Sequence, residues 1–197
     1  DFNNKNINRS INKRVSNLSR DEIMNKAFQL HSQGKTLEAS KYYQLFINKG
    51  FKDHRVFSNF GGILKNKGKL KEAEKYIRKA IELKPDYVIA ISNLGEILKI
   101  FGNLKEAEKY MRKAIEINPE YAISHYNLGC ILRDLGNLKE AEICLRKAIK
   151  LKPNFLDAHY NLGGLLSIIG NLKEAGRYIH NTIKLNPDFA RGYYFLS

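Results

Sequence analysis

Glycine and proline recur along this chain at a fixed interval of 34 residues. The glycines that keep this interval are Gly34, Gly68, Gly102, Gly136 and Gly170. The chain has four prolines, and all of them keep it too: Pro85, Pro119, Pro153 and Pro187. Alanines follow five residues after each of these glycines, at Ala39, Ala73, Ala107, Ala141 and Ala175. So many columns in register predict one structural unit that is repeated along the chain and stacked on its neighbours.

Residues 88–121 illustrate one period, and its first half reads as a helix. The apolar residues Ile91, Leu94 and Ile97 follow helical spacing. Gly95 lies inside this helix, where glycine is about 1 kcal/mol less favourable than alanine. We therefore expect a neighbouring helix to approach the backbone closely at Gly95.

The second half of the period reads as a turn followed by a second helix. Gly102 is suited to end the first helix, because glycine readily adopts positive φ. Asn103 is expected to cap the second helix, with Glu106 completing a capping box three residues later. The apolar residues of this helix share one side: Leu104, Ala107, Tyr110, Met111, Ala114 and Ile115. Pro119 closes the unit, which is thus predicted to be a helix–turn–helix hairpin.

Two segments, NLGEILKIFGNLKEAEKYMRKAIEINPEY and NLGCILRDLGNLKEAEICLRKAIKLKPNF, share Leu-Gly in the first helix, the turn glycine, two alanines in the second helix and the closing proline. With these features the chain resembles the tetratricopeptide repeat family, and the resemblance covers residues 20–197. It implies an all-α fold, a right-handed α-solenoid of 34-residue helix-turn-helix repeats. It also implies an interaction scaffold rather than an enzyme, without a cofactor.

The array is expected to hold five full repeats, at residues 20–53, 54–87, 88–121, 122–155 and 156–189, and the start of a sixth at residue 190. The first repeat departs from the pattern, with Ala27, Phe46 and Phe51 in place of glycine, alanine and proline. End repeats are often atypical, because one of their faces meets solvent. Residues 1–19 are polar, rich in Asn and basic, so we expect them to be disordered or loosely helical.

Charge and composition narrow the class of partner. The net charge of +14 raises the expectation of an acidic partner. However, the positive and negative residues expected on the first helices nearly cancel one another. The second helices carry alternating positive and negative residues, which is typical of a solvated helix face. Nucleic acid is therefore not favoured as a partner.

No apolar run reaches the roughly 18 residues of a membrane span. The two cysteines are too few for a disulfide framework, which favours reduced thiols and a cytoplasmic location.

The sequence offers no persuasive catalytic or metal-binding arrangement. Cys130 lies near His125, which could suggest a nucleophile and its base. However, His125 and His159 occupy the same place in successive repeats, and in the tetratricopeptide family that place holds a packing residue. We therefore expect both histidines to be structural. Metal binding by this pair is not favoured, because they are a whole hairpin apart and no third ligand is evident.

An asparagine precedes the Leu-Gly position in every full repeat, at Asn25, Asn59, Asn93, Asn127 and Asn161. Asparagine is a poor residue for a helix interior, because its side chain competes for backbone hydrogen bonds. The family resemblance implies that first helices line a concave groove, where an asparagine column would form a ladder that pairs with the backbone of an extended peptide. The alternative is that each asparagine bonds only locally.

Further candidates for peptide binding lie on the same helices. Lys65, Lys99 and Arg133 form a basic column. Tyr126 and Tyr160 offer aromatic faces with a polar tip, as binding surfaces favour, although packing within the hairpin would explain them equally well.

The favoured function is a protein-interaction scaffold that binds an extended peptide or a protein in its concave groove. One alternative is the substrate-recruiting repeat domain of a larger transferase, acting on glycosyl or sulfuryl groups, because arrays of this kind often precede such enzymes. Another is a self-assembling structural module that associates through the apolar residues 193–196 at its C-terminal edge.

Overall fold

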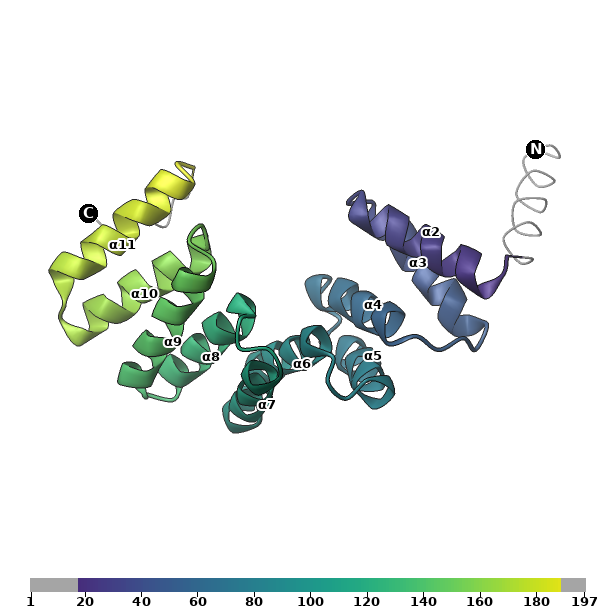
Figure 1. Cartoon of the computed structure of the whole chain (residues 1–197), viewed down its shortest axis with the longest axis horizontal. Coiled ribbons are helices and arrows are strands. Elements are labelled where there is room, and N and C mark those ends of the chain that lie inside the picture. Colours follow the sequence, from purple (N-terminus) through teal and green to yellow (C-terminus); the bar gives the residue numbers. More distant parts are fainter. Residues whose placement is uncertain (1–17, 189–197) are drawn as a thin grey trace. The chain divides into compact units, whose positions relative to one another are not determined.

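The computed structural model describes residues 18–188, and within this range the chain is helical and contains no strand. Consecutive helices pack in pairs, as hairpins (Figure 1). This arrangement confirms the predicted all-α fold of the solenoid class. The chain divides into two compact units, residues 1–85 and 86–197. The expectations for residues 1–17, for the sixth repeat and for its apolar edge lie outside the described residues.

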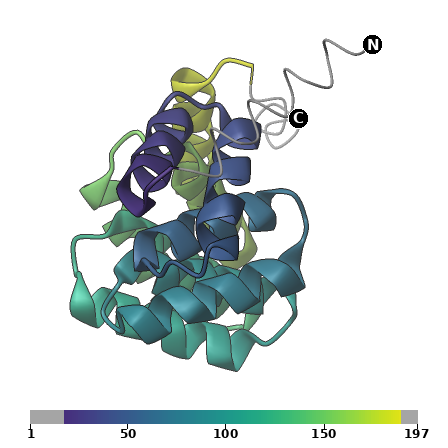
Figure 2. The same cartoon turned by 90° about the vertical axis from the view of Figure 1, so that its right-hand side faces the viewer.

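Unit 1 consists of two hairpins in its described part. Its helices are α2 (Arg20–Ser32), α3 (Thr36–Asn48), α4 (His54–Asn66) and α5 (Leu70–Leu83). Helix α2 packs on α3, α4 packs on α5, and α3 also contacts α4 (Figures 1 and 2). Each hairpin is thus stacked on the next one along the chain.

Unit 2 consists of three hairpins in its described part. Its helices are α6 (Val88–Ile100), α7 (Leu104–Ile117), α8 (Ala122–Asp134), α9 (Leu138–Leu151), α10 (Leu156–Ile169) and α11 (Leu172–Leu185). The second helix of a hairpin contacts the first helix of the next, and the first helices also contact one another, α6 with α8 and α8 with α10.

The repeated glycines end the first helices as predicted. Gly102 and Gly136 have φ of 80° and 83°. At the end of α8, the Gly136 N–H donates to the Arg133 carbonyl at 2.9 Å, and the Asn137 N–H donates to the Leu132 carbonyl at 2.8 Å. These two bonds form the Schellman motif, which satisfies carbonyl groups that the helix leaves unpaired.

The capping box expected at Asn103 is wrong. Asn103 does occupy the position before α7, but its side chain makes no capping hydrogen bond. Its backbone, with φ −79° and ψ 59°, is close to that of Asn171, with φ −84° and ψ 65°, whose side chain does accept from the Glu174 N–H. A capping box does occur at Ser19 and Glu22, where the Ser19 backbone is extended, with ψ 165°.

Glycines inside the first helices allow the two helices of a hairpin to meet closely, as the sequence predicts. At Gly129 of α8, an added Cβ would lie 2.8 Å from Leu145 Cγ and 3.1 Å from the Ala141 carbonyl oxygen, both of α9. The second helices contribute small buried residues to the same contacts: Ala73, Ala107, Ala141 and Ala175. Hairpin packing therefore depends on small residues on both sides.

The first repeat fills its core with aromatic rings. Phe46 and Tyr43 of α3 are fully buried. Phe51, which stands where other repeats have proline, packs its ring 5.4 Å from that of Phe46. The Tyr43 hydroxyl lies 3.0 Å from His31 Nδ1 of α2. Large side chains thus fill the volume that the other repeats close with small ones.

Charged side chains join successive hairpins of unit 2 along the second helices. The Arg112 guanidinium of α7 lies 2.8 Å from a Glu140 carboxylate oxygen of α9. Arg146 of α9 repeats this contact with Glu174 of α11, also at 2.8 Å, and donates to the Tyr178 hydroxyl at 2.9 Å. The same arginine column and the same glutamate column therefore form an ion pair at two successive hairpin junctions.

Candidate peptide-binding face

The five column asparagines all lie on first helices, but they differ in exposure. Asn25 of α2 is exposed, whereas Asn59 of α4, Asn93 of α6 and Asn161 of α10 are half-buried. Asn127 of α8 is buried. In unit 2, helices α6, α8 and α10 together form the surface that we call the first-helix face. Three of the asparagines belong to this face, and the other two belong to unit 1.

Asn161 is bonded on both sides of its amide. Its Nδ2 donates to the Tyr126 hydroxyl of α8 at 3.1 Å and to the Asp157 carbonyl at 2.8 Å. Its Oδ1 accepts from Arg133 of α8 at 2.9 Å. In unit 1, Asn59 donates to the Tyr43 hydroxyl at 3.1 Å. A peptide that pairs with Asn59 or Asn161 must therefore share or replace these bonds.

The basic column is brought together in unit 2, with one acidic residue between its members. Lys99 Nζ of α6 lies 3.6 Å from the Asp134 carboxylate of α8. Arg133 donates to the same carboxylate, through its Nε at 3.2 Å and a terminal nitrogen at 2.9 Å. Lys65 lies on α4 of unit 1, where it is half-buried. The charge of the first-helix face is therefore partly neutralised at Asp134.

The two predicted tyrosines have different roles. The Tyr126 ring packs 4.8 Å from the Phe155 ring, and burial raises the pKa of its hydroxyl above the usual value. Tyr126 thus packs against Phe155 and also accepts a hydrogen bond from Asn161. Tyr160 lines a cavity between α8 and α10, together with Arg133 and four other residues, and is only half-buried.

That cavity has a volume of about 410 Å³ and is lined by Arg133, Tyr160, Asn161, Gly164, Ser167 and Ile168. The first three of these were predicted from the sequence as peptide-binding residues, whereas Ser167 and Ile168 were not. The signal that could have found Ser167 is the 34-residue interval itself, because Ser167 continues the column of Lys65, Lys99 and Arg133.

The two histidines are structural, as expected. His125 Nε2 donates to the Pro119 carbonyl at 2.8 Å, and His159 Nε2 donates to the Pro153 carbonyl at the same distance. Each ring thus ties its first helix to the loop before it. Cys130 is buried, and burial raises the pKa of its thiol, which disfavours the thiolate that nucleophilic chemistry needs. In residues 18–188, no three His, Cys, Asp or Glu side chains group as a metal site.

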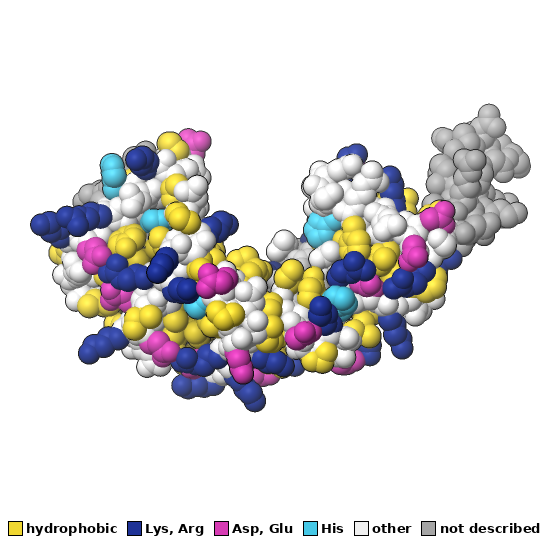
Figure 3. All heavy atoms as spheres, in the orientation of Figure 1, with side chains coloured by type: hydrophobic (Ala, Val, Ile, Leu, Met, Phe, Trp, Pro, Cys, Tyr) yellow, Lys and Arg dark blue, Asp and Glu magenta, His cyan; other side chains and the backbone are white. Residues whose placement is uncertain are grey.

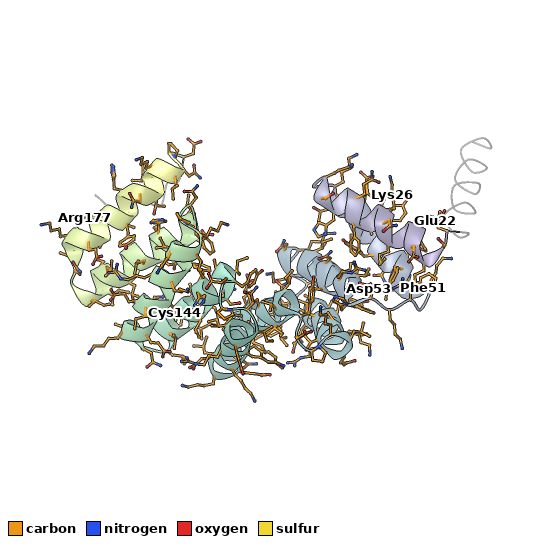
Figure 4. All side chains as sticks on the ribbon, in the orientation of Figure 1. Glu22, Lys26, Phe51, Asp53, Cys144 and Arg177 are labelled. Atoms are coloured by element: carbon orange, nitrogen blue, oxygen red, sulfur yellow. The ribbon has the colours of Figure 1, made fainter. Side chains whose placement is uncertain are left out.

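The second helices carry many of the chain's Lys and Arg residues, and most of these are exposed. Lys and Arg side chains protrude from the surface of α7 (Figure 3). Arg177 of α11 extends away from its hairpin, whereas Cys144 of α9 is buried (Figure 4). None of the described helices is long and apolar enough to cross a membrane.

Hairpins that stack on one another within each unit define a helical-repeat protein. Two sequence models of the tetratricopeptide repeat match the chain, one over residues 86–154 and the other over residues 54–87, which together span just over half of it. The chain therefore belongs to the tetratricopeptide repeat family. Its fold and family support a general role as a protein-interaction scaffold. No curated protein matches the chain.

Solved structures with the same fold are distant in sequence. TTC0263, a thermophilic tetratricopeptide repeat protein of Thermus thermophilus, is 19% identical, with a TM-score of 0.73 over 90% of this chain and 96% of its own. MamA from Desulfovibrio magneticus RS-1 is 20% identical, with a TM-score of 0.70 over 87% and 97%. YrrB, described as a tetratricopeptide repeat protein with an unusual peptide-binding site, is 21% identical, with a TM-score of 0.66 over 95% and 96%.

Proposed function

We propose that this protein binds an extended peptide segment of a partner protein on the first-helix face of unit 2. The observation that carries the proposal is the cluster of Arg133, Asn161 and Tyr126, which links α8 to α10 beside an open cavity. Donors held in place by their own neighbours lose little freedom when a ligand binds, so they suit a recognition surface.

The residues of this face supply both kinds of contact that an extended peptide needs. An amide such as that of Asn93 carries donors and an acceptor that suit backbone C=O and N–H groups. Asn161 donates to Tyr126 and Asp157, so it pairs with a peptide by sharing or replacing those bonds. Tyr160 and Ile168 supply apolar surface for side chains. YrrB, the tetratricopeptide repeat protein with an unusual peptide-binding site, agrees with this use of the fold.

A peptide-binding screen tests the proposal. We would present an array of extended peptides to the full chain and to the double variant Asn93→Ala/Asn161→Ala. Losing two hydrogen-bonding amides is expected to weaken peptide capture by roughly tenfold or more, since each net hydrogen bond contributes about 0.5–1.5 kcal/mol.

The matched control is Asn181→Ala, which removes an exposed amide from α11, outside the first-helix face. This variant should capture the same peptides as the unmodified chain. Equal capture by all three proteins would place binding elsewhere on the molecule, and the proposal would then be wrong.

A further inference from the structure

Two adjacent glycines in α10 differ in what their surroundings require. At Gly163, an added Cβ would lie 2.8 Å from Ile179 Cγ1 and 3.3 Å from the Ala175 carbonyl oxygen, so packing against α11 explains this glycine. At Gly164, an added Cβ would meet no atom within 4 Å. Packing does not explain Gly164, although glycine in a helix interior is less favourable than alanine by roughly 0.5–1 kcal/mol.

The empty space at Gly164 is the cavity between α8 and α10, and one strip of its lining along α10 is largely apolar. Tyr160 lies four residues before Gly164 and Ile168 lies four residues after it, so the three residues share one face of the helix. Ile168 is 65% exposed, a high value for a large aliphatic side chain. An apolar ligand group beside Ile168 would remove this surface from water.

Arg133 closes the polar end of the cavity, and it is the one charged residue among those that line it. A guanidinium has five N–H groups. Two of its donor nitrogens bond to Asp134 and a third bonds to Asn161, which fixes the plane of the group and leaves N–H groups over for a ligand. Asp134 neutralises the charge of Arg133 only in part, because it also pairs with Lys99. Arg133 can therefore donate to a neutral carbonyl acceptor, and its remaining charge disfavours a Lys or Arg side chain.

We propose that this cavity receives one large apolar side chain, Leu, Ile, Met or Phe, of the bound peptide, and that a backbone carbonyl of that peptide accepts from Arg133. The inference rests on the peptide-binding function proposed above and adds the chemical class of the side chain that is recognised. The volume of the cavity lies within the range of about 300–1,000 Å³ that is usual for ligand pockets.

Gly164→Leu is the variant that tests this assignment, because its side chain would occupy the cavity from the protein's own side. Gly176→Leu is a matched control. Gly176 also lies inside a helix of unit 2, an added Cβ there also meets nothing within 4 Å, and α11 contributes no residue to the cavity. Both variants should retain the helical circular dichroism and the melting temperature of the unmodified chain, or exceed that temperature.

The probe is a positional-scanning library of short peptides with one central residue fixed in turn and the flanking positions randomised. The full chain is expected to enrich Leu, Ile, Met and Phe over Ala and Lys by about tenfold or more, since burying such a side chain contributes roughly 1.5–3 kcal/mol. Gly164→Leu should lose this preference, and Gly176→Leu should keep it. The δ1-methyl NMR signal of Ile168 should shift on binding, whereas that of Ile143, which is also exposed but belongs to α9 outside the first-helix face, should not.

Two results would overturn the assignment, and they have different meanings. If Gly164→Leu binds the same peptides with the same preference, the cavity is not the recognition pocket, while peptide binding itself still stands. If the unmodified chain enriches no peptide at all, both the pocket and the proposed function are wrong.

Discussion

Gly129 and Gly164 both lie in the interior of a first helix, yet opposite physical conditions surround them. Gly129 faces α9 so closely that a Cβ would crowd Leu145, whereas Gly164 faces open space. The first glycine is required by packing, and the second is the one that we assign to ligand binding. Two residues of the same type thus predict opposite responses to substitution.

Gly129→Val is expected to destabilise the protein by about 1–3 kcal/mol, because the branched side chain would force α8 and α9 apart. Gly164→Ala provides the comparison, since it adds a methyl group in open space and should raise stability by up to about 1 kcal/mol. Thermal unfolding followed by circular dichroism measures both changes. An unchanged melting temperature for Gly129→Val would show that close helix approach is not what this glycine provides.

Cys144 is expected to react slowly in the folded chain. Burial raises the pKa of its thiol to about 11, with a smaller contribution from Glu140. At pH 8 the reactive thiolate is then roughly one part in a thousand, compared with about a quarter for a free cysteine. Alkylation by iodoacetamide, followed by peptide mass spectrometry, should be at least about a hundredfold slower in the native chain than in urea.

The same pKa shift affects stability at alkaline pH. The unfolded chain loses its thiol protons first, so the stabilising contribution of the protonated Cys144 is fully present below about pH 9 and disappears as the pH rises towards about 11. If Cys144 is alkylated equally fast in the folded and unfolded chains at pH 8, this account of its burial is wrong.

The role of a single residue could be predicted where close packing within a hairpin determines it. It could not be predicted where the residue bonds to a side chain of a neighbouring repeat. Gly129 and the turn glycine Gly136 follow from their columns, since their role is repeated in each hairpin. The bonds of Asn161 to Tyr126 and Arg133 depend on side chains one repeat away. Their orientations are not encoded in the spacing, so the sequence indicated the column but not its partners.

Helices α6 and α8 are joined by a buried pair of hydroxyl groups. The Oγ atoms of Ser92 and Ser124 lie 2.7 Å apart, and both residues are buried. The repeats on either side of Ser124 have alanine at its position, Ala90 and Ala158. The pair is therefore a local feature of one junction and not part of the repeated pattern, which explains why periodicity did not predict it.

Ser124→Ala alone is expected to cost about 1–3 kcal/mol, because it leaves the Ser92 hydroxyl buried without this partner. The double variant Ser92→Ala/Ser124→Ala should be closer to the unmodified chain than Ser124→Ala is, since both polar groups are then removed. Chemical unfolding of the two single variants and the double variant gives the coupling energy. Additive losses would show that the two hydroxyl groups do not depend on one another.

Helix boundaries were the most predictable elements, because glycine and the 34-residue interval mark each turn. Val88, Ala122 and Leu156 begin both a period of the sequence and a helix of the structure. The capping box at Asn103 was wrong because a residue type alone does not determine the orientation of its side chain. Asn171 also follows a glycine of positive φ and has nearly the same backbone angles as Asn103, yet its side chain accepts from the Glu174 N–H.

The whole molecule carries a net charge of +14 and an isoelectric point near 9.7. Paired contacts such as those of Arg112 and Arg146 do not remove this excess, which lies largely outside the first-helix face. Like charges repel at distances up to the screening length, about 10 Å in 0.1 M salt. We therefore expect this net charge to oppose the association of separate copies of the chain.

Static light scattering at pH 7 and low salt should show a constant molecular mass across concentration, with net repulsion between copies. The repulsion should weaken in about 0.5 M salt, and again as the pH approaches the isoelectric point of 9.7. A mass that increases with concentration at low salt would contradict this prediction. It would indicate an association contact strong enough to overcome the repulsion, as expected of a self-assembling module.

The repeated links between hairpins also determine how such a chain can change in length. Arg112 meets Glu140, and Arg146 meets Glu174, through the same two columns. Deleting the codons for residues 122–155 would bring Glu174 to the position that Glu140 now holds, 28 positions after Arg112. The deletion would thus recreate the ion pair between Arg112 and a glutamate. Duplication or loss of a single repeat during evolution would therefore preserve the junction chemistry, and the number of repeats can vary while each junction keeps its ion pair.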